Sequence, residues 1–112
     1  MDCLFCKFIS GEIAVNKVYE DENCIIIRDI APQAKNHFLA IPKKHFKFLA
    51  EMSEDDAKMV GKILATIPKL ESLLELEGGY RLVINQGDNP GQTVPHLHIH
   101  ILSGQKMGWT PA

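Results

Sequence analysis

Three histidines alternate with apolar residues near the C-terminus of the chain, at His96, His98 and His100. Successive side chains of a strand point to opposite faces, so these imidazoles are expected to share one face, about 6–7 Å from one to the next. The leucine and isoleucines between them are expected to pack in the core. Closely placed imidazolium charges repel, so such a row favours the binding of an anion or a metal ion.

The loop before this strand helps to choose between the two ligands. It contains Gly87, Gly91, Gln92 and Thr93, which offer backbone amides and a hydroxyl to phosphoryl oxygens. Neutral imidazole is a good zinc ligand, but a catalytic zinc is disfavoured because no His-Glu-x-x-His helix and no carboxylate accompany the strand. Histidine itself attacks phosphorus in some enzymes. A glycine-rich loop alone is also typical of a plain turn; loop and histidines together favour phosphate chemistry.

A second group that could do chemistry is the Cys-x-x-Cys pair, Cys3 and Cys6. Zinc needs about four ligands, so this pair is only half of a metal site. The alternatives are a redox pair, for which no thioredoxin-like βαβ pattern is visible, or two buried thiols. Cys24 lies in an apolar stretch and is interpreted as a small core residue.

The elements that position these residues follow from the hydrophobic pattern. Ser53 is expected to cap a long helix with apolar residues at alternating steps of three and four, kinked or split by Pro68 and stopped by Gly78-Gly79. Several strands, one major helix and no βαβ alternation predict an α+β domain with a mainly antiparallel sheet. The predicted strands cover residues 13–19, 24–27, 37–41, 80–85 and 96–102.

Composition limits the possible functions. The 112 residues are 46% hydrophobic and 23% charged, with a net charge of −2, which suits one domain over residues 1–112. Neither nucleic acid nor a membrane is an expected partner, because basic clusters and long apolar runs are missing. With no secretory signal and an odd number of cysteines, a cytoplasmic location is expected. A chain this short buries a smaller share of its surface than a larger domain does, and pairing with a second copy would bury more of it. A homodimer is therefore expected.

The run His-Leu-His-Ile-His-Ile-Leu resembles the His-x-His-x-His-x-x motif, with x apolar, of the histidine triad (HIT) family. The resemblance is greatest to the Hint branch, the purine nucleoside phosphoramidases. It implies a HIT-like fold: about five strands in a mainly antiparallel sheet, one long helix and a short N-terminal helix. Further matching motifs lie at residues 11–13, 18–21, 29–34, 41–45, 79–85 and 107–109.

The resemblance implies a catalytic role for several residues. His98 would attack the α-phosphorus of a purine nucleoside 5′-phosphoramidate, giving a nucleotidyl-histidine that water hydrolyses. His100 and the backbone near Thr93 would hold phosphoryl oxygens, and the Thr93 hydroxyl would help protonate the departing amine. His37 would orient the triad through His96.

The resemblance also implies a nucleotide site for AMP or GMP derivatives. Asp29 would accept hydrogen bonds from the ribose hydroxyls, and Asn85 would bond the phosphate side. The residues expected to form the apolar slot for the base are Phe5, Phe8, Ile27 and Ile30. The loop residues expected at the nucleotide are Gly91, Gln92 and Thr93.

For the cysteine pair, the resemblance implies that His45 and His96 complete a tetrahedral zinc with Cys3 and Cys6. Such a closed Cys₂His₂ site is structural, and no catalytic metal is expected. Without zinc, two buried thiols remain the alternative.

The C-terminal tail leaves the substrate preference open. Residues 103–106 and 109–112 depart from the typical tail of the family, which in Hint-like dimers approaches the partner's active site. The alternative functions are a dinucleoside polyphosphate or related nucleotidyl hydrolase, and a nucleotide-binding scaffold with incidental activity.

Overall fold

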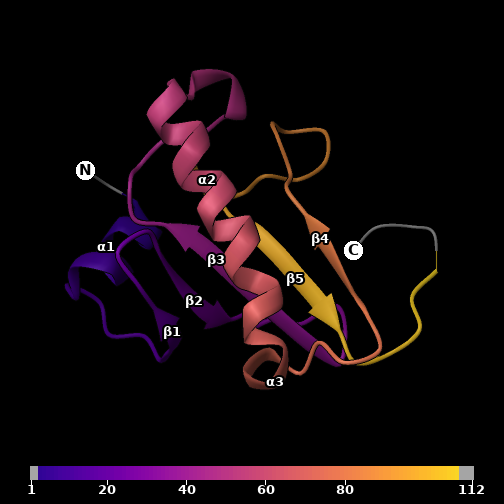
Figure 1. Cartoon of the computed structure of the whole chain (residues 1–112). Helices are drawn as coiled ribbons and strands as arrows, with labels where there is room; N and C mark the ends of the chain where they lie inside the picture. The colour runs from indigo at the N-terminus through magenta and orange to yellow at the C-terminus, as the bar shows by residue number, and fades with distance from the viewer. Residues whose placement is uncertain (1–2, 109–112) are drawn as a thin grey trace.

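The computed structural model describes residues 3–108 and contains a five-stranded sheet in the order β1-β2-β3-β5-β4, with every neighbouring pair antiparallel (Figure 1). The predicted α+β class is confirmed. The strands are β1 (Lys17–Glu20), β2 (Cys24–Arg28), β3 (Asn36–Pro42), β4 (Tyr80–Val83) and β5 (Ile99–Ser103). The helices are α1 (Leu4–Ser10), η1 (Leu49–Glu51), α2 (Glu54–Thr66), η2 (Ile67–Leu70) and α3 (Glu71–Leu74).

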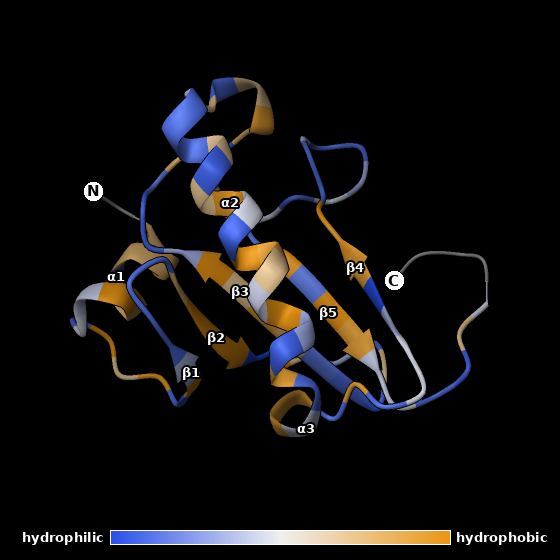
Figure 2. Cartoon of the chain, viewed as in Figure 1, coloured by the Kyte–Doolittle hydropathy of each residue, from blue (hydrophilic) through white to orange (hydrophobic). Residues whose placement is uncertain are grey.

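The central strands β2 and β3 are buried on both faces. On one face Ile26 and Phe38 pack against Ile63 of α2. On the other face Ile25 and Ile27 pack with residues of α1. Figure 1 shows α2 lying across β3 and β5, and Figure 2 shows the hydrophobic strands beneath it. The sheet therefore has an α2 face, which is the larger core, and an α1 face.

The long helix α2 begins as predicted. The Ser53 side chain accepts a hydrogen bond from the backbone of Asp56, and the Asp56 carboxylate accepts one from the backbone of Ser53. This reciprocal cap satisfies two amides that a helix N-terminus leaves unpaired. Val60 and Ile63 are buried on the inner side of α2.

Pro68 splits the helix as predicted, but the stop is not at Gly78-Gly79. The chain tightens into η2, and α3 ends at Leu74, where Glu75 takes a left-handed conformation with φ of 56°. The backbone of Leu76 then donates to the carbonyl of Glu71 over 2.9 Å, a bond typical of a Schellman cap. Leu76 is 1% exposed, so burial of this side chain explains a left-handed residue that is not glycine.

Two strands begin later than predicted, and β4 ends at Val83 rather than at residue 85. β1 starts only at Lys17, because residues 11–14 are exposed and make no ladder. β5 starts at Ile99, so His96 and His98 precede it. The segment before β5 follows Pro95 and is fixed differently, by a hydrogen bond from the backbone of Leu97 to the carbonyl of Phe46 over 2.7 Å.

The conformation of Gly104 and a hydrogen bond from Arg81 define the path of the chain after β5. Gly104 has φ of 89°, and a Cβ there would lie 2.6 Å from the Asn36 side chain. Farther along, Arg81 donates to the carbonyl of Gly108 over 2.6 Å. Trp109 and the remaining atypical tail lie outside the described residues. Among the described residues, no helix is long and apolar enough to cross a membrane.

Candidate active site

The histidines gather on the α1 face of the sheet, opposite the larger core. His37 lies on β3 and His100 on β5, where Leu39 is the direct cross-strand partner of His100. The ring centroids of His98 and His100 are 5.1 Å apart. Phe5 of α1 packs edge-on against His98, with ring centroids 5.0 Å apart. The strands β3 and β5, the segment just before β5 and the helix α1 therefore build the site together.

The hydrogen-bond partner of His98 determines its tautomer. Nδ1 of His98 lies 2.8 Å from the carbonyl oxygen of His96. A carbonyl only accepts, so Nδ1 carries the proton, and Nε2 of the neutral ring keeps its lone pair. His98 is 7% exposed, which restricts access of water to the ring. The geometry gives the ring a nucleophilic nitrogen in a fixed orientation.

A chain of hydrogen bonds fixes the neighbouring rings as well. The backbone of Gln33 donates to Nδ1 of His37 over 3.0 Å, so a neutral His37 carries its proton on Nε2. Nε2 of His37 lies 2.9 Å from Nδ1 of His100 and donates to it. His100 therefore carries its own proton on Nε2. This relay ends in an N–H group that can donate to a ligand.

The relay corrects one sequence-based expectation. His37 was expected to orient the triad through His96, but it contacts His100, whereas Nε2 of His96 donates to the carbonyl of Pro42 over 2.7 Å. The reason is the register of β3 against β5, which sequence alone does not specify. Asp29 follows β2 and lies 3.5 Å from Nε2 of His37, completing this group.

Burial keeps the relay neutral. The pKa of His100 is lowered to about 4, chiefly by desolvation and then by the charges of His98 and His37. The pKa of His37 is also lowered by burial, and the carboxylate of Asp29 partly opposes this. Both rings are thus uncharged near neutral pH, as the assignment of one proton to each ring requires.

Near the end of the relay lies Asn85, whose amide nitrogen is 3.5 Å from Nε2 of His100. With the proton of His100 on Nε2, both groups are donors and cannot satisfy one another. Donors that converge in this way suit an anionic oxygen between them. Asn85 follows β4, which is paired to β5 as far as Val83.

The loop before the histidines is held together by Gln92. Its side chain accepts from the backbone of Gly87 over 2.9 Å and donates to the carbonyl of Lys47 over 3.1 Å. The backbone amides of Gln92 and Gly91 donate within the loop, to Gly87 and Asp88 respectively. These donors therefore shape the loop, and the contacts of Gly91 and Gln92 with a nucleotide stay a prediction. Thr93 is exposed at its end.

An apolar cavity of about 130 Å³ lies beside the histidines. It brings together the four residues expected to form a base slot, with Asp29 at its edge. Leu4, Val15 and Leu39 add to it and were missed, although Leu39 follows His37 by two positions and so shares its face of β3. The residues that line the cavity are Leu4, Phe5, Phe8, Val15, Ile27, Arg28, Asp29, Ile30 and Leu39.

A second cluster brings together three separate parts of the sequence: Cys3 and Cys6, His45, and His96, whose ligand atoms all lie within 4.8 Å of one another. Nδ1 of His96 lies 3.3 Å from Sγ of Cys3 and 3.5 Å from Sγ of Cys6. Nδ1 of His45 lies 3.2 Å from Sγ of Cys6 and 3.1 Å from Nδ1 of His96.

These spacings fit a tetrahedral zinc. Metal–ligand distances of about 2.0–2.3 Å put neighbouring ligand atoms of a tetrahedron about 3.3–3.8 Å apart. The tautomer fits as well, because Nε2 of His96 donates to Pro42 and leaves the Nδ1 lone pair toward the sulfurs. The four residues would fill all positions of such an ion.

Asp29, His37 and His100 also lie close enough to hold a metal, but their protons argue against it. Nδ1 of His37 accepts from the Gln33 backbone, so Nε2, the nitrogen facing the cluster, must be protonated. A protonated nitrogen has no lone pair for a metal. We interpret this group as a hydrogen-bond relay.

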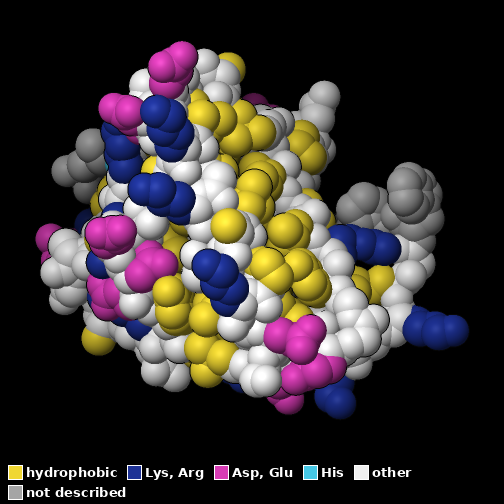
Figure 3. Space-filling view, viewed as in Figure 1, with side chains coloured by type: hydrophobic (Ala, Val, Ile, Leu, Met, Phe, Trp, Pro, Cys, Tyr) yellow, Lys and Arg dark blue, Asp and Glu magenta, His cyan; other side chains and the backbone are white. Residues whose placement is uncertain are grey.

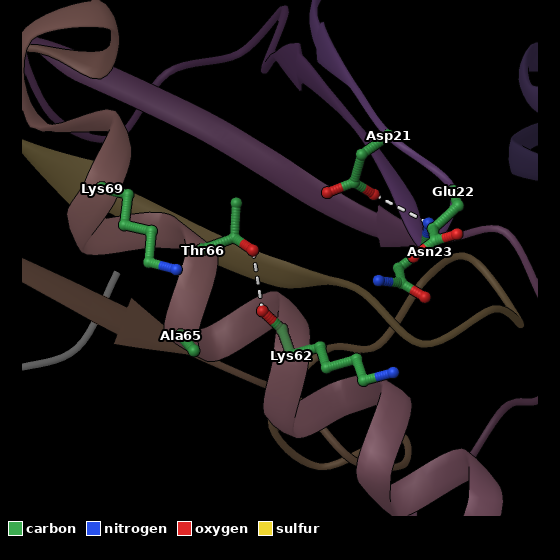
Figure 4. Close-up of a pocket in the computed structure, with 7 residues that line it drawn as sticks. All are labelled: Asp21, Glu22, Asn23, Lys62, Ala65, Thr66 and Lys69. Atoms are coloured by element: carbon green, nitrogen blue, oxygen red, sulfur yellow. Dashed lines mark hydrogen bonds between the residues drawn. The ribbon is translucent and has the colours of Figure 1, made fainter.

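A wider hollow of about 500 Å³ lies between α2 and the turn after β1 (Figure 4). Its polar groups already bond to their own elements: Thr66 donates to the carbonyl of Lys62, and Asp21 accepts from the backbone of Asn23. Figure 4 shows Lys62 and Lys69 extended along its wall. It offers no buried reactive group comparable to the histidine site.

The antiparallel α+β sheet and the histidine cluster on its α1 face define the class of this protein, a histidine-triad domain. A family model described as HIT domain matches residues 10–107. The chain therefore belongs to the HIT domain family, as its motifs predicted.

Relatives match along nearly the whole chain. An uncharacterized HIT-like protein of Synechococcus elongatus is 44% identical over 110 residues, covering 98% of this chain and 96% of its own. The structure of a HIT family hydrolase from Legionella pneumophila Philadelphia 1 has a TM-score of 0.91 at 45% identity, covering 99% of this chain and 100% of that one. A histidine triad protein from Clostridium difficile has a TM-score of 0.90 at 38% identity, with 99% and 97% covered.

Proposed function

We propose that this HIT domain, spanning residues 1–112, hydrolyses purine nucleoside 5′-phosphoramidates to a nucleoside monophosphate and an amine. The observation that carries the proposal is the lone pair on Nε2 of His98, which the bond from Nδ1 to the His96 carbonyl fixes. The nucleophile adjoins donors suited to phosphoryl oxygens and a cavity suited to a base. The designation of the Legionella relative as a hydrolase agrees with this assignment.

The reaction would proceed in two displacements at phosphorus. Nε2 of His98 forms an N–P bond while the substrate P–N bond breaks, and the amine leaves with a proton, which the Thr93 hydroxyl helps to deliver. Water then attacks the phosphorus and gives up a proton that restores the Thr93 hydroxyl, the bond to His98 breaks, and the nucleoside monophosphate is released. The His98 ring is cationic in the intermediate, so its bond to the His96 carbonyl becomes charge-assisted and stronger.

The hydrogen-bond relay would position donors for the phosphate. Nε2–H of His100 and the Asn85 amide would donate to the nonbridging oxygens, whose negative charge grows as the nucleophile approaches. A neutral His100 is useful here, because it keeps a donor in place without placing a second cation beside His98.

The apolar cavity would hold the purine, between α1 and the end of β2. Asp29 lies at the rim between this cavity and His37, which suits acceptance of hydrogen bonds from ribose hydroxyls. Ile30 is fully exposed at the rim and would be covered by a bound base.

For the second cluster we propose zinc held by Cys3, Cys6, His45 and His96. With its four positions filled, the ion would cross-link the N-terminus to the sheet and would not activate water. Cys3, Cys6 and Cys24 form no disulfide in the described structure, which supports our proposal of a reducing, cytoplasmic location.

We further propose a homodimer through β4. This strand is at the edge of the sheet and exposes Tyr80 and Leu82, while Leu64 of α2 and Leu73 of α3 are exposed as well. Figure 3 shows hydrophobic side chains gathered along α2 and beside it. Pairing with a second copy would cover an open edge and this apolar surface.

The proposal is tested by initial rates of nucleoside monophosphate release from adenosine 5′-phosphoramidate and from a diadenosine polyphosphate. Wild type and His98→Ala are compared in parallel. Faster cleavage of the phosphoramidate, lost in the variant, supports the proposal. Faster cleavage of the polyphosphate favours the alternative hydrolase, and unchanged activity in the variant favours a binding protein with incidental activity.

A further inference from the structure

We propose that metal occupancy at Cys3, Cys6, His45 and His96 sets the affinity of the protein for the base of a nucleotide, through the position of α1. The inference rests on the proposed function, because it requires both a metal at the cluster and a nucleotide at the histidines. It adds a coupling between two sites that both contact one aromatic ring, that of Phe5.

The helix α1 carries parts of both sites. Cys3 and Cys6 come from its N-terminal turn, and Leu4, Phe5 and Phe8 on the same helix line the apolar cavity. The proposed metal site and the apolar cavity therefore share the seven residues of α1 and its N-cap. A displacement of α1 would move part of both sites.

So short a helix depends on its anchors. Helices below about 12 residues are marginal in water without tertiary contacts. Its N-cap is the sulfur of Cys3, which accepts from the backbone of Cys6 over 3.3 Å. The same sulfur is a proposed metal ligand. A metal would thus fix the helix N-terminus to His45 and His96, which belong to the sheet side of the cluster.

Phe5 makes the link between the sites direct. It is 4% exposed, and its ring packs edge-on against both His96, with centroids 5.9 Å apart, and His98, with centroids 5.0 Å apart. His96 belongs to the metal cluster and His98 is the proposed nucleophile. A shift of the α1 N-terminus would move this ring and with it one wall of the cavity.

The groups proposed for the phosphate do not belong to α1. His100 lies on β5 and is held by His37 of β3, while Asn85 follows β4. Loss of the metal should therefore weaken recognition of the base and leave recognition of the phosphate nearly unchanged. This selectivity distinguishes the coupling from a general loss of structure.

The experiment is calorimetric titration of the full chain, zinc-loaded and chelator-stripped, with AMP and with ribose 5-phosphate, which lacks the base. We expect stripping to weaken AMP binding about tenfold, a common size for coupling between sites, and to change ribose 5-phosphate binding less than about twofold. Because coupling is reciprocal, saturating AMP should raise the affinity for zinc by the same factor, measured by competition with a chelator.

Two variants complete the design. Cys24→Ser removes a thiol outside the cluster and should behave as wild type, which controls for thiol chemistry. Phe5→Leu keeps the metal ligands and an apolar side chain but removes the ring, so in the zinc-loaded protein AMP should no longer raise the zinc affinity. In the zinc-loaded protein, Phe5→Leu should also weaken AMP binding more than ribose 5-phosphate binding, and this comparison does not require the stripped protein to stay folded.

The outcomes separate this inference from the proposed function. Equal AMP affinity with and without zinc overturns the coupling and leaves the proposed function standing. The coupling is also overturned if removal of zinc weakens the binding of AMP and of ribose 5-phosphate equally. It is likewise overturned if AMP still raises the zinc affinity of Phe5→Leu by the wild-type factor. Failure of AMP to bind the zinc-loaded protein, or of zinc to bind at all, defeats the coupling together with the nucleotide or metal assignment it needs.

Discussion

At the scale of single residues, backbone partners determine where the protons of the site lie. The His96 carbonyl fixes the tautomer of His98, and the Gln33 amide fixes that of His37. The His37 ring then fixes His100. Each ring is oriented by a group whose donor or acceptor role is unambiguous, so the lone pair of His98 and the N–H of His100 are ready before a ligand arrives.

The relay predicts a graded response at His37. His37→Leu removes the donor to Nδ1 of His100, so His100 is free to take the other tautomer and lose its Nε2–H; we expect kcat to fall about 10²-fold. His37→Gln keeps an amide that can donate and should retain more activity. Steady-state kinetics of both variants check this, and equal rates for the two would contradict the relay.

The lowered pKa of His100 predicts acid sensitivity of folding. The pKa of an unperturbed histidine is 6.5, whereas the pKa of His100 in the folded protein is about 4. Between these two pH values the unfolded state binds a proton at His100 and the folded state does not. The contribution of His100 to stability is therefore full above pH 6.5 and is lost as the pH falls toward 4. Urea unfolding at pH 7 and pH 5 should show a smaller loss for His100→Gln than for wild type. An equal loss in both proteins would contradict a neutral His100.

At the scale of elements, the two faces of the sheet have different roles. The α2 face is an apolar core in which Phe38, Ile63 and Ile101 are buried. The α1 face carries the histidines and the apolar cavity. Alternation along β3 and β5 produces this division, because neighbouring residues of a strand serve opposite faces.

The cap of α2 gives a prediction confined to the element. Ser53→Ala removes the acceptor for the Asp56 amide and should lower the free energy of unfolding by about 1 kcal/mol. Catalytic constants should not change, because α2 lies on the face opposite the histidines. Chemical denaturation and kinetics measure both, with Ser72→Ala, an exposed serine in α3, as the matched control. A loss of activity at unchanged stability would contradict the division of duties.

Local signals in the sequence predicted most elements. The Ser53 cap, the Pro68 interruption and the apolar runs of β2 and β3 each depend on near neighbours. The pairing of His37 with His100 could not be predicted, because it depends on strand register. The helix end at Leu74 was missed because burial of Leu76 outweighs the local preference for glycine. The cavity residues were inferred from family resemblance, since apolar residues alone are typical of any core.

At the scale of the whole molecule, the helix α1 and the segment after β5 both contact parts of the sheet that carry proposed sites. The N-terminal helix contacts the histidines and the proposed metal cluster. After β5, Arg81 of β4 holds the chain at Gly108, on the edge strand proposed for the dimer. The face proposed to bind the nucleotide and the edge proposed for the dimer are thus joined by β4 and β5.

The proposed dimer predicts that a charge introduced on β4 prevents association. Leu82→Lys places a cation on the exposed apolar surface at this edge and should convert the dimer into a monomer. Light scattering coupled to size-exclusion chromatography measures this. Ile13→Lys, at a site of similar exposure before β1, is the matched control and should remain dimeric. A wild-type monomer, or a dimer that persists in Leu82→Lys, would contradict the assignment.

The central claim is that Nε2 of His98 attacks phosphorus. The most direct measurement is a rapid-quench single turnover with adenosine 5′-phosphoramidate under alkaline quench, followed by mass spectrometry and phosphorus NMR of the labelled peptide. The account predicts a transient adenylyl group on Nε2 of His98, formed and lost at rates compatible with kcat. An adduct on Nδ1 or on another histidine would contradict it, and so would turnover that proceeds through no adduct at all.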